Sequence, residues 1–372
     1  MRKIIVSAML CGMITAGFAQ VKLPEWVGNV KLSGYGMTQY QANFQKDAKT
    51  NTFNIRMLRV ALDGKTGEFY WKAQIQFNGN TSTLGSSPRV VDAFAEWQHF
   101  DFLRVKAGQF KRPFTFENPM NPIDQGFMSY GQAVLKLAGF SDRDGDHSSN
   151  GRDIGVQLQG DFLKNAAGRN LLHYQVGLFN GQGINMSDVD NQKDLIGGIW
   201  VMPVKGMRLG VFGWTGSFAR KGNYDAADPT NTATRTVRLQ QRRYALSAEY
   251  KADGWTLRSE FIHSTGSAFK KTYQKDTDSK DLTINTGIGN KGDGYYALAI
   301  APVIQNKLFA KARYDVYMAD SHWNRAKSMY EAGLNYNFTK NIQLNAEYAL
   351  VNDRNLAKHN YSMVDAQLDF RF

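Results

Sequence analysis

Residues 364–372 of the chain read VDAQLDFRF. Apolar side chains occupy every second position, and Asp, Gln or Arg occupies each position between them. Because successive side chains of a β-strand point to opposite faces, this alternation predicts a strand with one apolar and one polar face. A helix would instead require apolar residues three or four positions apart.

The same period of two recurs along the chain from residue 29 onward, for example in 152–160, 170–180 and 341–352. Applied to the whole sequence, it predicts sixteen strands. They lie near 29–42, 53–63, 68–79, 90–98, 101–109, 152–161, 170–180, 193–202, 206–217, 242–251, 254–264, 294–303, 307–318, 327–338, 341–352 and 363–372.

The connections between these strands alternate between tight and long. Tight connections such as 99–100 and 252–253 are followed by long ones such as 110–151 and 265–293, and 162–169 is somewhat long for a turn. Outer-membrane barrels have short periplasmic turns at one rim and long external loops at the other. The sequence therefore predicts an all-β protein, a 16-stranded antiparallel transmembrane β-barrel. A soluble β-sandwich would also alternate, but it gives no reason for loop length to alternate between ends.

Composition supports a single barrel and excludes several other classes. The chain has 372 residues, 42% of them hydrophobic and 21% charged. Its mean hydropathy is −0.44, and no stretch after residue 20 has the length and apolar content of a membrane-spanning helix. Glycine is not periodic and no heptad recurs, so collagen and coiled coil are excluded.

The first residues have the features of a targeting segment. Arg2 and Lys3 precede the apolar run 4–14, and small residues at 17 and 19 favour cleavage after Ala19. We therefore expect residues 1–19 to be a signal peptide, 20–28 a short periplasmic segment, and 29–372 the barrel. A terminal aromatic residue on the apolar face, Phe372, resembles the signal that bacterial outer-membrane assembly machinery recognises.

The polar face of such a barrel would line an aqueous channel, because sixteen strands enclose more space than their own side chains fill. The strand phases place basic and acidic residues on this face in nearly equal number. The candidates for pore-lining or anion-binding cations are Arg59, Lys72, Arg104, Lys106, Lys111, Arg112, Arg208, Arg258, Lys311 and Arg313. For any one of them, ion pairing that stiffens the wall is an equally good interpretation.

The connection 110–151 is the third long one. Its prolines disfavour strand pairing, and its apolar residues, such as Phe114, Phe116 and Phe127, indicate that it packs on something. We expect it to fold into the barrel and narrow the channel. Packing on a neighbouring subunit or on itself remains open.

Signals for other functions are weak. The six histidines form no HExxH motif, and no GxSxG elbow, phosphate-binding loop or dinucleotide-binding fingerprint is present. We therefore expect no enzyme activity, no metal and no cofactor. Positive charges are spread along the strands, which does not favour nucleic acid as a partner. A plugged transporter would need an N-terminal plug domain, but strand-like sequence begins at residue 29.

Four ordered motifs resemble the phosphate-selective porin O and P family. They are 56–64 with 69–74, 103–114, 151–158 and 176–181, and the most specific is LRVKAGQFKRPF at 103–114. The resemblance implies a sixteen-stranded outer-membrane porin, usually a homotrimer, embedded in outer-membrane lipid.

The sequence thus predicts a multi-pass protein of the bacterial outer membrane through which small solutes diffuse passively. Phosphate and other small anions are the favoured permeants. A non-selective general-diffusion porin is the alternative, and a structural or adhesive barrel is a weaker one.

Overall fold

The computed structural model describes residues 29–78, 88–140, 149–223, 228, 230, 232–270 and 280–372. The expected signal peptide and the segment 20–28 lie outside these residues, and so does part of the connection 110–151.

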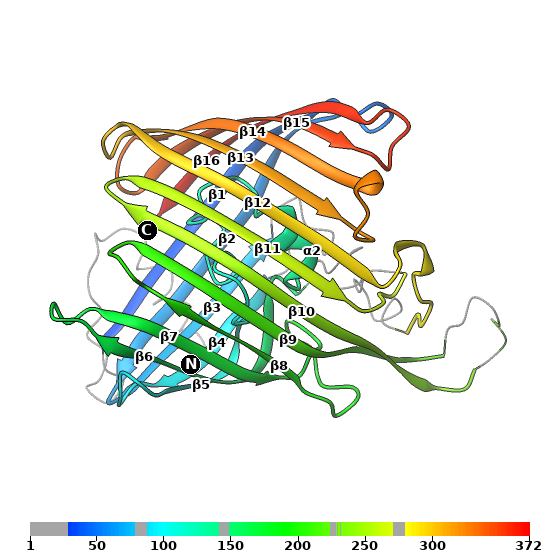
Figure 1. Ribbon diagram of the computed structural model, residues 1–372, viewed down its shortest axis with the longest axis horizontal. Coiled ribbons are helices and arrows are strands. Elements are labelled where there is room, and N and C mark those ends of the chain that lie inside the picture. The colour runs from blue at the N-terminus through cyan, green and yellow to red at the C-terminus, as the bar shows by residue number, and fades with distance from the viewer. Residues whose placement is uncertain are drawn as a thin grey trace, which may run out of the picture.

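The described residues form sixteen β-strands in one closed antiparallel barrel (Figure 1). Each strand pairs with its neighbours in sequence, and β1 pairs with β16 to complete the closure. The barrel predicted from side-chain alternation is therefore confirmed. The strands are β1 (Asn29–Asn43), β2 (Thr50–Thr66), β3 (Phe69–Asn78), β4 (Pro88–Trp97), β5 (Arg104–Lys111), β6 (Arg152–Lys164), β7 (Asn170–Phe179), β8 (Asp194–Val201), β9 (Met207–Gly222), β10 (Arg235–Ala252), β11 (Trp255–Thr265), β12 (Lys291–Ile304), β13 (Leu308–Met318), β14 (Ala326–Asn337), β15 (Ile342–Asp353) and β16 (Asn360–Arg371).

In the described part of the connections lie three short helices: α2 (Gln132–Leu137) and the 3-10 turns η3 (Thr286–Ile288) and η4 (Trp323–Arg325). Within the described ranges, no helix has the length and apolar content that crossing a membrane would require.

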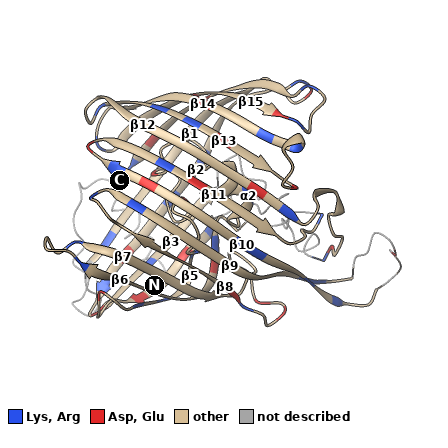
Figure 2. Cartoon of the chain, viewed as in Figure 1, with Lys and Arg blue, Asp and Glu red and all other residues tan. Residues whose placement is uncertain are grey.

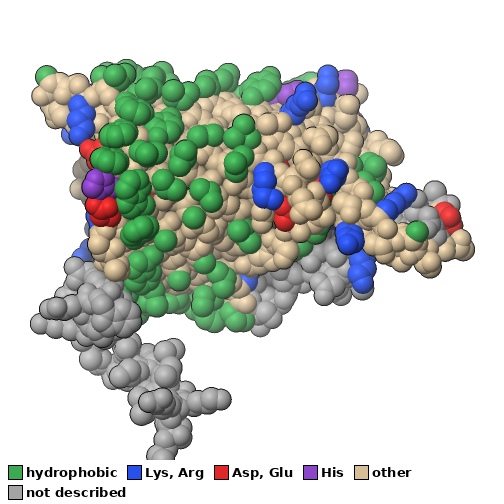
Figure 3. Space-filling view, turned by 90° about the horizontal axis from the view of Figure 1, so that it is seen from below, with side chains coloured by type: hydrophobic (Ala, Val, Ile, Leu, Met, Phe, Trp, Pro, Cys, Tyr) green, Lys and Arg blue, Asp and Glu red, His purple; other side chains and the backbone are tan. Residues whose placement is uncertain are grey.

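The two faces of the wall have opposite polarity. Leu178, Val211 and Leu246 are more than half exposed on the outer face, whereas Arg243, Ser247 and Glu249 are buried on the inner face. Hydrophobic side chains spread over the flank in Figure 3, and Figure 2 shows basic and acidic residues interspersed along the strands. This inverted arrangement suits a barrel whose outer face meets lipid.

The strands β9 and β10 continue beyond their expected ends and form a hairpin that projects from one end of the barrel (Figure 1). Pairing runs out to Gly222 and Arg235, whereas side-chain alternation predicts ends at 217 and 242. The added part contains the cations Arg220, Lys221 and Arg238, but Phe218 and Leu239 are buried in it and pack with Phe269.

The ends of the barrel differ in the length of their connections. Those at 67–68, 253–254 and 305–307 are short, and the turn after β6 is 165–169 because this strand continues to Lys164. Longer connections at 112–151, 180–193 and 266–290 lie at the other end, together with the projecting hairpin (Figure 1).

Two β-bulges change the side-chain phase in the first quarter of the wall. One lies opposite the step from Met37 to Thr38, where β2 has an extra residue, Arg56. The other lies opposite the step from Gln74 to Ile75, where β4 has an extra residue, Val91. A bulge places two residues of one strand against one of its partner, so strict alternation fails there.

The C-terminal residue completes the barrel seam. Phe372 and Gly34 exchange two backbone hydrogen bonds of 2.9 and 3.0 Å. A Cβ atom on Gly34 would lie 2.3 Å from the Cζ atom of Phe372, so the aromatic ring covers the glycine. An aromatic ring over a glycine on the neighbouring strand stabilises strand pairing.

We expect Phe372→Ala to weaken this seam by about 1 kcal/mol, the upper end for an aromatic cross-strand contact. The measurement is the temperature at which the folded band converts to the unfolded band on a gel. Phe372→Tyr keeps the ring and should behave like the wild type. Equal conversion temperatures for the Ala variant and the wild type would contradict this role.

Candidate functional site

Residues 112–140 of the long connection between β5 and β6 lie inside the barrel. We call them the inner loop. Their apolar side chains, among them Phe114, Phe127 and Val134, form one buried cluster with Phe212, Tyr296 and other inner-face residues of the wall. The helix α2 packs against β11, β12 and β13. The interior is therefore partly filled by a segment of its own chain.

Close approach of α2 to the wall depends on a glycine of β12. A Cβ atom on Gly294 would lie 2.8 Å from Cβ and 2.9 Å from Cα of Ala133 in the helix. Both distances are shorter than real Cβ contacts, so only glycine allows the helix to rest here.

Basic side chains of the wall bind backbone carbonyl oxygens of the inner loop. Arg258 donates to the carbonyl of Gln125 at 2.7 Å, and Arg313 donates to that of Ser129 at 2.8 Å. Three further donors do the same from other strands: Lys311 to Gly126, Arg243 to Leu137 and Arg56 to Met128.

Acidic side chains of the wall accept from backbone N–H groups of the same segment. Glu260 accepts from Phe116 and Glu117, Asp315 accepts from Gln132 at 2.8 Å, and Glu347 accepts from Met128 at 2.9 Å. Charged partners make such hydrogen bonds stronger than neutral ones. The wall thus anchors the loop main chain with both signs of charge.

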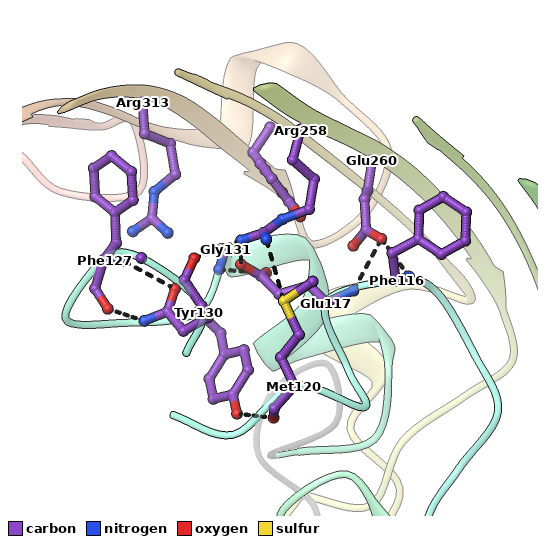
Figure 4. Close-up of polar contacts among 12 residues, drawn as sticks. Phe116, Glu117, Met120, Phe127, Tyr130, Gly131, Arg258, Glu260 and Arg313 are labelled. Atoms are coloured by element: carbon purple, nitrogen blue, oxygen red, sulfur yellow. Dashed lines mark hydrogen bonds and ion pairs between the residues drawn. The ribbon is translucent and has the colours of Figure 1, made fainter. Parts of the chain in front are cut away.

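Arg258 is the most connected of these anchors (Figure 4). Its guanidinium is buried and donates to Glu117 of the loop at 3.0 Å, to Glu249 at 3.3 Å and to the Tyr296 hydroxyl at 2.9 Å. Glu117 in turn accepts from the backbone N–H of Gly131 at 3.0 Å. One side chain therefore links three wall strands to two turns of the inner loop.

Lys111 and Tyr130 hold the other side of the loop. Lys111, expected at the start of the loop, is the last residue of β5. Its ammonium group donates to the carbonyls of Asn118 and Met120 and to the Tyr130 hydroxyl, at 2.7, 2.9 and 3.1 Å. Burial raises the pKa of Tyr130, so its hydroxyl stays protonated and donates to Met120 at 2.7 Å.

Most of the cations expected to line the pore are paired with carboxylates. Arg104 pairs with Asp161 at 2.6 Å, Lys106 with Glu96 at 3.4 Å, and Arg208 with Glu249 at 2.8 Å. Arg112, Arg258, Lys311 and Arg313 are likewise paired, with Asp153, Glu117, Glu347 and Glu331. Pairing lowers the net field that a passing ion meets at these seven positions.

A second group of cations lies on β2 to β6 with little negative charge beside it. We call Arg59, Arg89, Lys111 and Arg152 the basic cluster. Arg89 pairs in register with Gln76, and Gln76 pairs with Arg59 on the next strand. Arg152 binds Asp92 through two hydrogen bonds of 2.7 and 3.1 Å. Among the described residues, Asp92 is the carboxylate that the cluster binds.

Hydrogen bonds bring the members of the basic cluster together. Arg59 donates to Gln76 and to the Tyr35 hydroxyl, both at 2.8 Å. Asn150 donates to the same oxygen of Gln76 at 3.4 Å and accepts from Arg152 at 3.1 Å. The charges of Arg59, Arg89 and Arg152 lie within electrostatic range of one another, and so do those of Lys111, Arg59 and Arg152.

One polar atom in this cluster lacks a partner within the described part of the chain. The Nη2 atom of Arg59 is buried and makes no hydrogen bond there. A buried donor without an acceptor is costly, so this atom favours an acceptor supplied from outside the protein. Lys72 lies on the same face one strand along, half-buried, and adds a further positive charge near Asp92.

Sequence patterns alone miss Arg56 and Arg89, and both omissions have the same cause. Arg56 is the extra residue of one β-bulge, and Arg89 lies just beyond the other. Strict alternation from Asp92 would direct Arg89 outward, but the bulge at Val91 returns it to the inner face beside Gln76. Arg152 is missed because it lies next to Asp153 at the start of β6, where both side chains are buried.

The described residues give little support for a metal site or for reactive histidines. No three His, Cys, Asp or Glu side chains there lie close enough to hold a metal ion. Four histidines, His99, His173, His263 and His322, pair with the carboxylates Glu68, Asp161, Asp293 and Asp320.

Comparison with known proteins yields one family model and many solved structures. The family model described as phosphate-selective porin O and P matches residues 32–280. A search of curated proteins found no match.

The solved structures that resemble this one are outer-membrane porins. The anion-selective porin from Comamonas acidovorans has a TM-score of 0.62 at 14% identity, over 92% of this chain and 99% of that one. OmpF of Salmonella typhi, in complex with daunomycin, has a TM-score of 0.62 at 13% identity, over 94% and 99%. The trimer form of OmpT, an outer-membrane protein of Vibrio cholerae, has a TM-score of 0.59 at 12% identity, over 93% and 100%. At these identities the likeness concerns the fold.

Proposed function

Because the chain belongs to the phosphate-selective porin O and P family, we propose that it is a passive channel whose favoured permeants are phosphate and other small anions. Family and fold support a porin of the bacterial outer membrane and favour a channel over an enzyme. The basic cluster is the observation that supports anion preference.

The uneven distribution of ion-paired and unpaired cations over the inner face favours a preference for anions. Seven candidate cations are neutralised by carboxylates, whereas Arg59, Arg89, Lys111 and Arg152 share a single carboxylate among the described residues. Charged side chains lining a pore select ions by the field they create. The excess positive field is therefore concentrated on β2 to β6, where an anion would be attracted.

We further propose that the inner loop forms the constriction. It contacts wall residues from β5 through β16, including Glu260, Lys311 and Arg371. A segment anchored at so many points has little freedom to leave the lumen. Solutes would then pass beside this loop, along the part of the wall that carries Arg59 and Arg89.

A non-selective general-diffusion porin is the second candidate, and the seven ion pairs favour it. If the seven ion-paired cations and their carboxylates dominate the electric field in the lumen, the four cations of the basic cluster would favour anions only weakly. The experiment below separates the two candidates.

Replacing Arg59 and Arg89 by Gln should lower the anion-to-cation permeability ratio about sixteenfold, because the anion loses an attraction and the cation loses an equal repulsion, each worth about fourfold. One charge acts on an ion about 10 Å away with about 0.4 kcal/mol in water, and two such charges are removed. Reversal potentials of single channels in a planar bilayer, under chloride and then phosphate gradients, measure this ratio. The matched control, Lys205→Gln with Lys340→Gln, removes two exposed turn cations and should keep the wild-type reversal potential.

Anion selectivity in the wild type that persists in the Arg59/Arg89 variant would contradict the role of the basic cluster. Weak selectivity in the wild type itself would favour the general-diffusion alternative.

We also propose a homotrimer, supported by the trimer form described for the similar OmpT structure. Recognition of Phe372 by the assembly machinery is a further proposal, supported by its position at the barrel seam.

A further inference from the structure

The outer flank of β10, β11 and β12 changes from apolar to basic in successive rows toward the end that carries the long connections. Strand register aligns Leu246 with Phe261 and Tyr295 in one row. The next row contains Tyr244, His263 and Asp293. The row beyond it contains Arg242, Thr265 and Lys291.

The two cations of the outermost row stand on either side of a hydroxyl group. Arg242 and Lys291 are separated by two interstrand spacings, about 10 Å, and Thr265 lies between them. Both cations are exposed, and Arg242 makes no ion pair with any described residue. The carboxylate nearest in register, Asp293, is bound to the His263 ring at 2.6 Å.

A hollow of about 310 Å³ opens beside this row, and its mixed polar and apolar lining includes a third cation. Its lining includes Arg238, Gln240, Ser267 and Asn290 together with Lys291. Arg238 binds Asp190 at 3.0 Å, yet its side chain remains 47% exposed.

We propose that this flank binds the phosphorylated headgroup of a glycolipid in the outer leaflet. The acyl chains would lie on the row of Leu246, and the phosphate oxygens would accept hydrogen bonds from Arg242 and Lys291. Arginine and lysine beside an apolar membrane belt attract anionic lipid, and arginine suits phosphate geometry. The proposal assumes that the end with the long connections faces outward, as in other outer-membrane barrels.

Native mass spectrometry of the purified full-length protein in detergent, titrated with bisphosphorylated lipid A, tests this site. The wild type should retain the lipid, and the Arg242→Gln/Lys291→Gln variant should bind it about thirtyfold more weakly, about fivefold per cation removed. Conversion temperature on a gel checks that the variant barrel is folded.

The control variant, Lys46→Gln with Lys358→Gln, removes two exposed loop cations and should bind like the wild type. An equal loss of binding in the control would overturn the proposal, since overall charge would then explain it. Equal binding of a dephosphorylated lipid A would also overturn it, as would displacement of the lipid by a modest excess of inorganic phosphate.

Discussion

Replacing Arg258 by Met is expected to loosen the inner loop where Glu117 and Gln125 contact the wall and to raise single-channel conductance. Methionine fills similar space but donates no hydrogen bond. The variant therefore loses the bonds to the Gln125 carbonyl, to Glu117 and to the Tyr296 hydroxyl. The current through single channels should become larger and noisier.

The expected size of the effect follows from burial. Arg258 and Glu117 are both buried, and Glu249 and Glu260 lie beside them. Removing one partner of a buried ion pair leaves the opposite charge without compensation, at a cost of about 3–5 kcal/mol. This free energy destabilises the docked loop relative to the undocked loop, because the carboxylate of Glu117 can regain water once that part of the loop leaves the wall.

Arg104→Met is the matched control. Arg104 is also an ion-paired arginine of the inner face, but its partners Asp161 and Glu96 lie on wall strands. This variant should leave the loop docked, with at most a small change in conductance. A similar rise in both variants would show that lost charge, and not loop release, controls the current.

Gly294→Leu is expected to lower single-channel conductance, which is the opposite of the change expected for Arg258→Met. Its Cβ atom would meet Ala133 of α2 at 2.8 Å, so the helix must move away from β12 toward the lumen. Overpacking of a buried contact typically costs about 1–3 kcal/mol, and the remaining anchors of the loop should keep it inside the barrel. A displaced helix then occupies part of the passage.

The control for this prediction is Gly213→Leu on the outer face of β9. A Cβ atom on Gly213 meets nothing within 4 Å, and leucine suits a lipid-facing position. Conductance should stay at the wild-type value. If Gly294→Leu also conducts like the wild type, the helix does not border the passage.

The barrel could be predicted from the sequence because the alternation of apolar and polar residues within a strand shows which of its faces is apolar. In β16, for instance, the apolar face of 364–372 is the outer face, and Gln367 and Asp369 are buried inside. Alternation is a local property, so it needs no knowledge of the partner strands. The same rule correctly directs Arg258 and Arg313 inward.

The partners of the charged residues could not be predicted in the same way. Glu260 accepts from Phe116 although 144 positions separate them, and no local pattern contains such a contact. Arg89 of the basic cluster and the loop anchor Arg56 owe their positions to two β-bulges, which insert single residues without a sequence signal of their own. Charge balance along the lumen is therefore a property of the folded wall.

The anchors of the inner loop have a consequence for engineering. Arg258, Lys311 and Arg313 bind carbonyl oxygens, and Asp315 and Glu347 bind N–H groups. Every residue type supplies the carbonyl, and every type except proline supplies the N–H. The wall thus fixes the course of the inner-loop backbone without requiring particular side chains along the loop. Substitutions at partly exposed positions of the inner loop could therefore change the selectivity of the proposed constriction, while the residues of the wall stay the same.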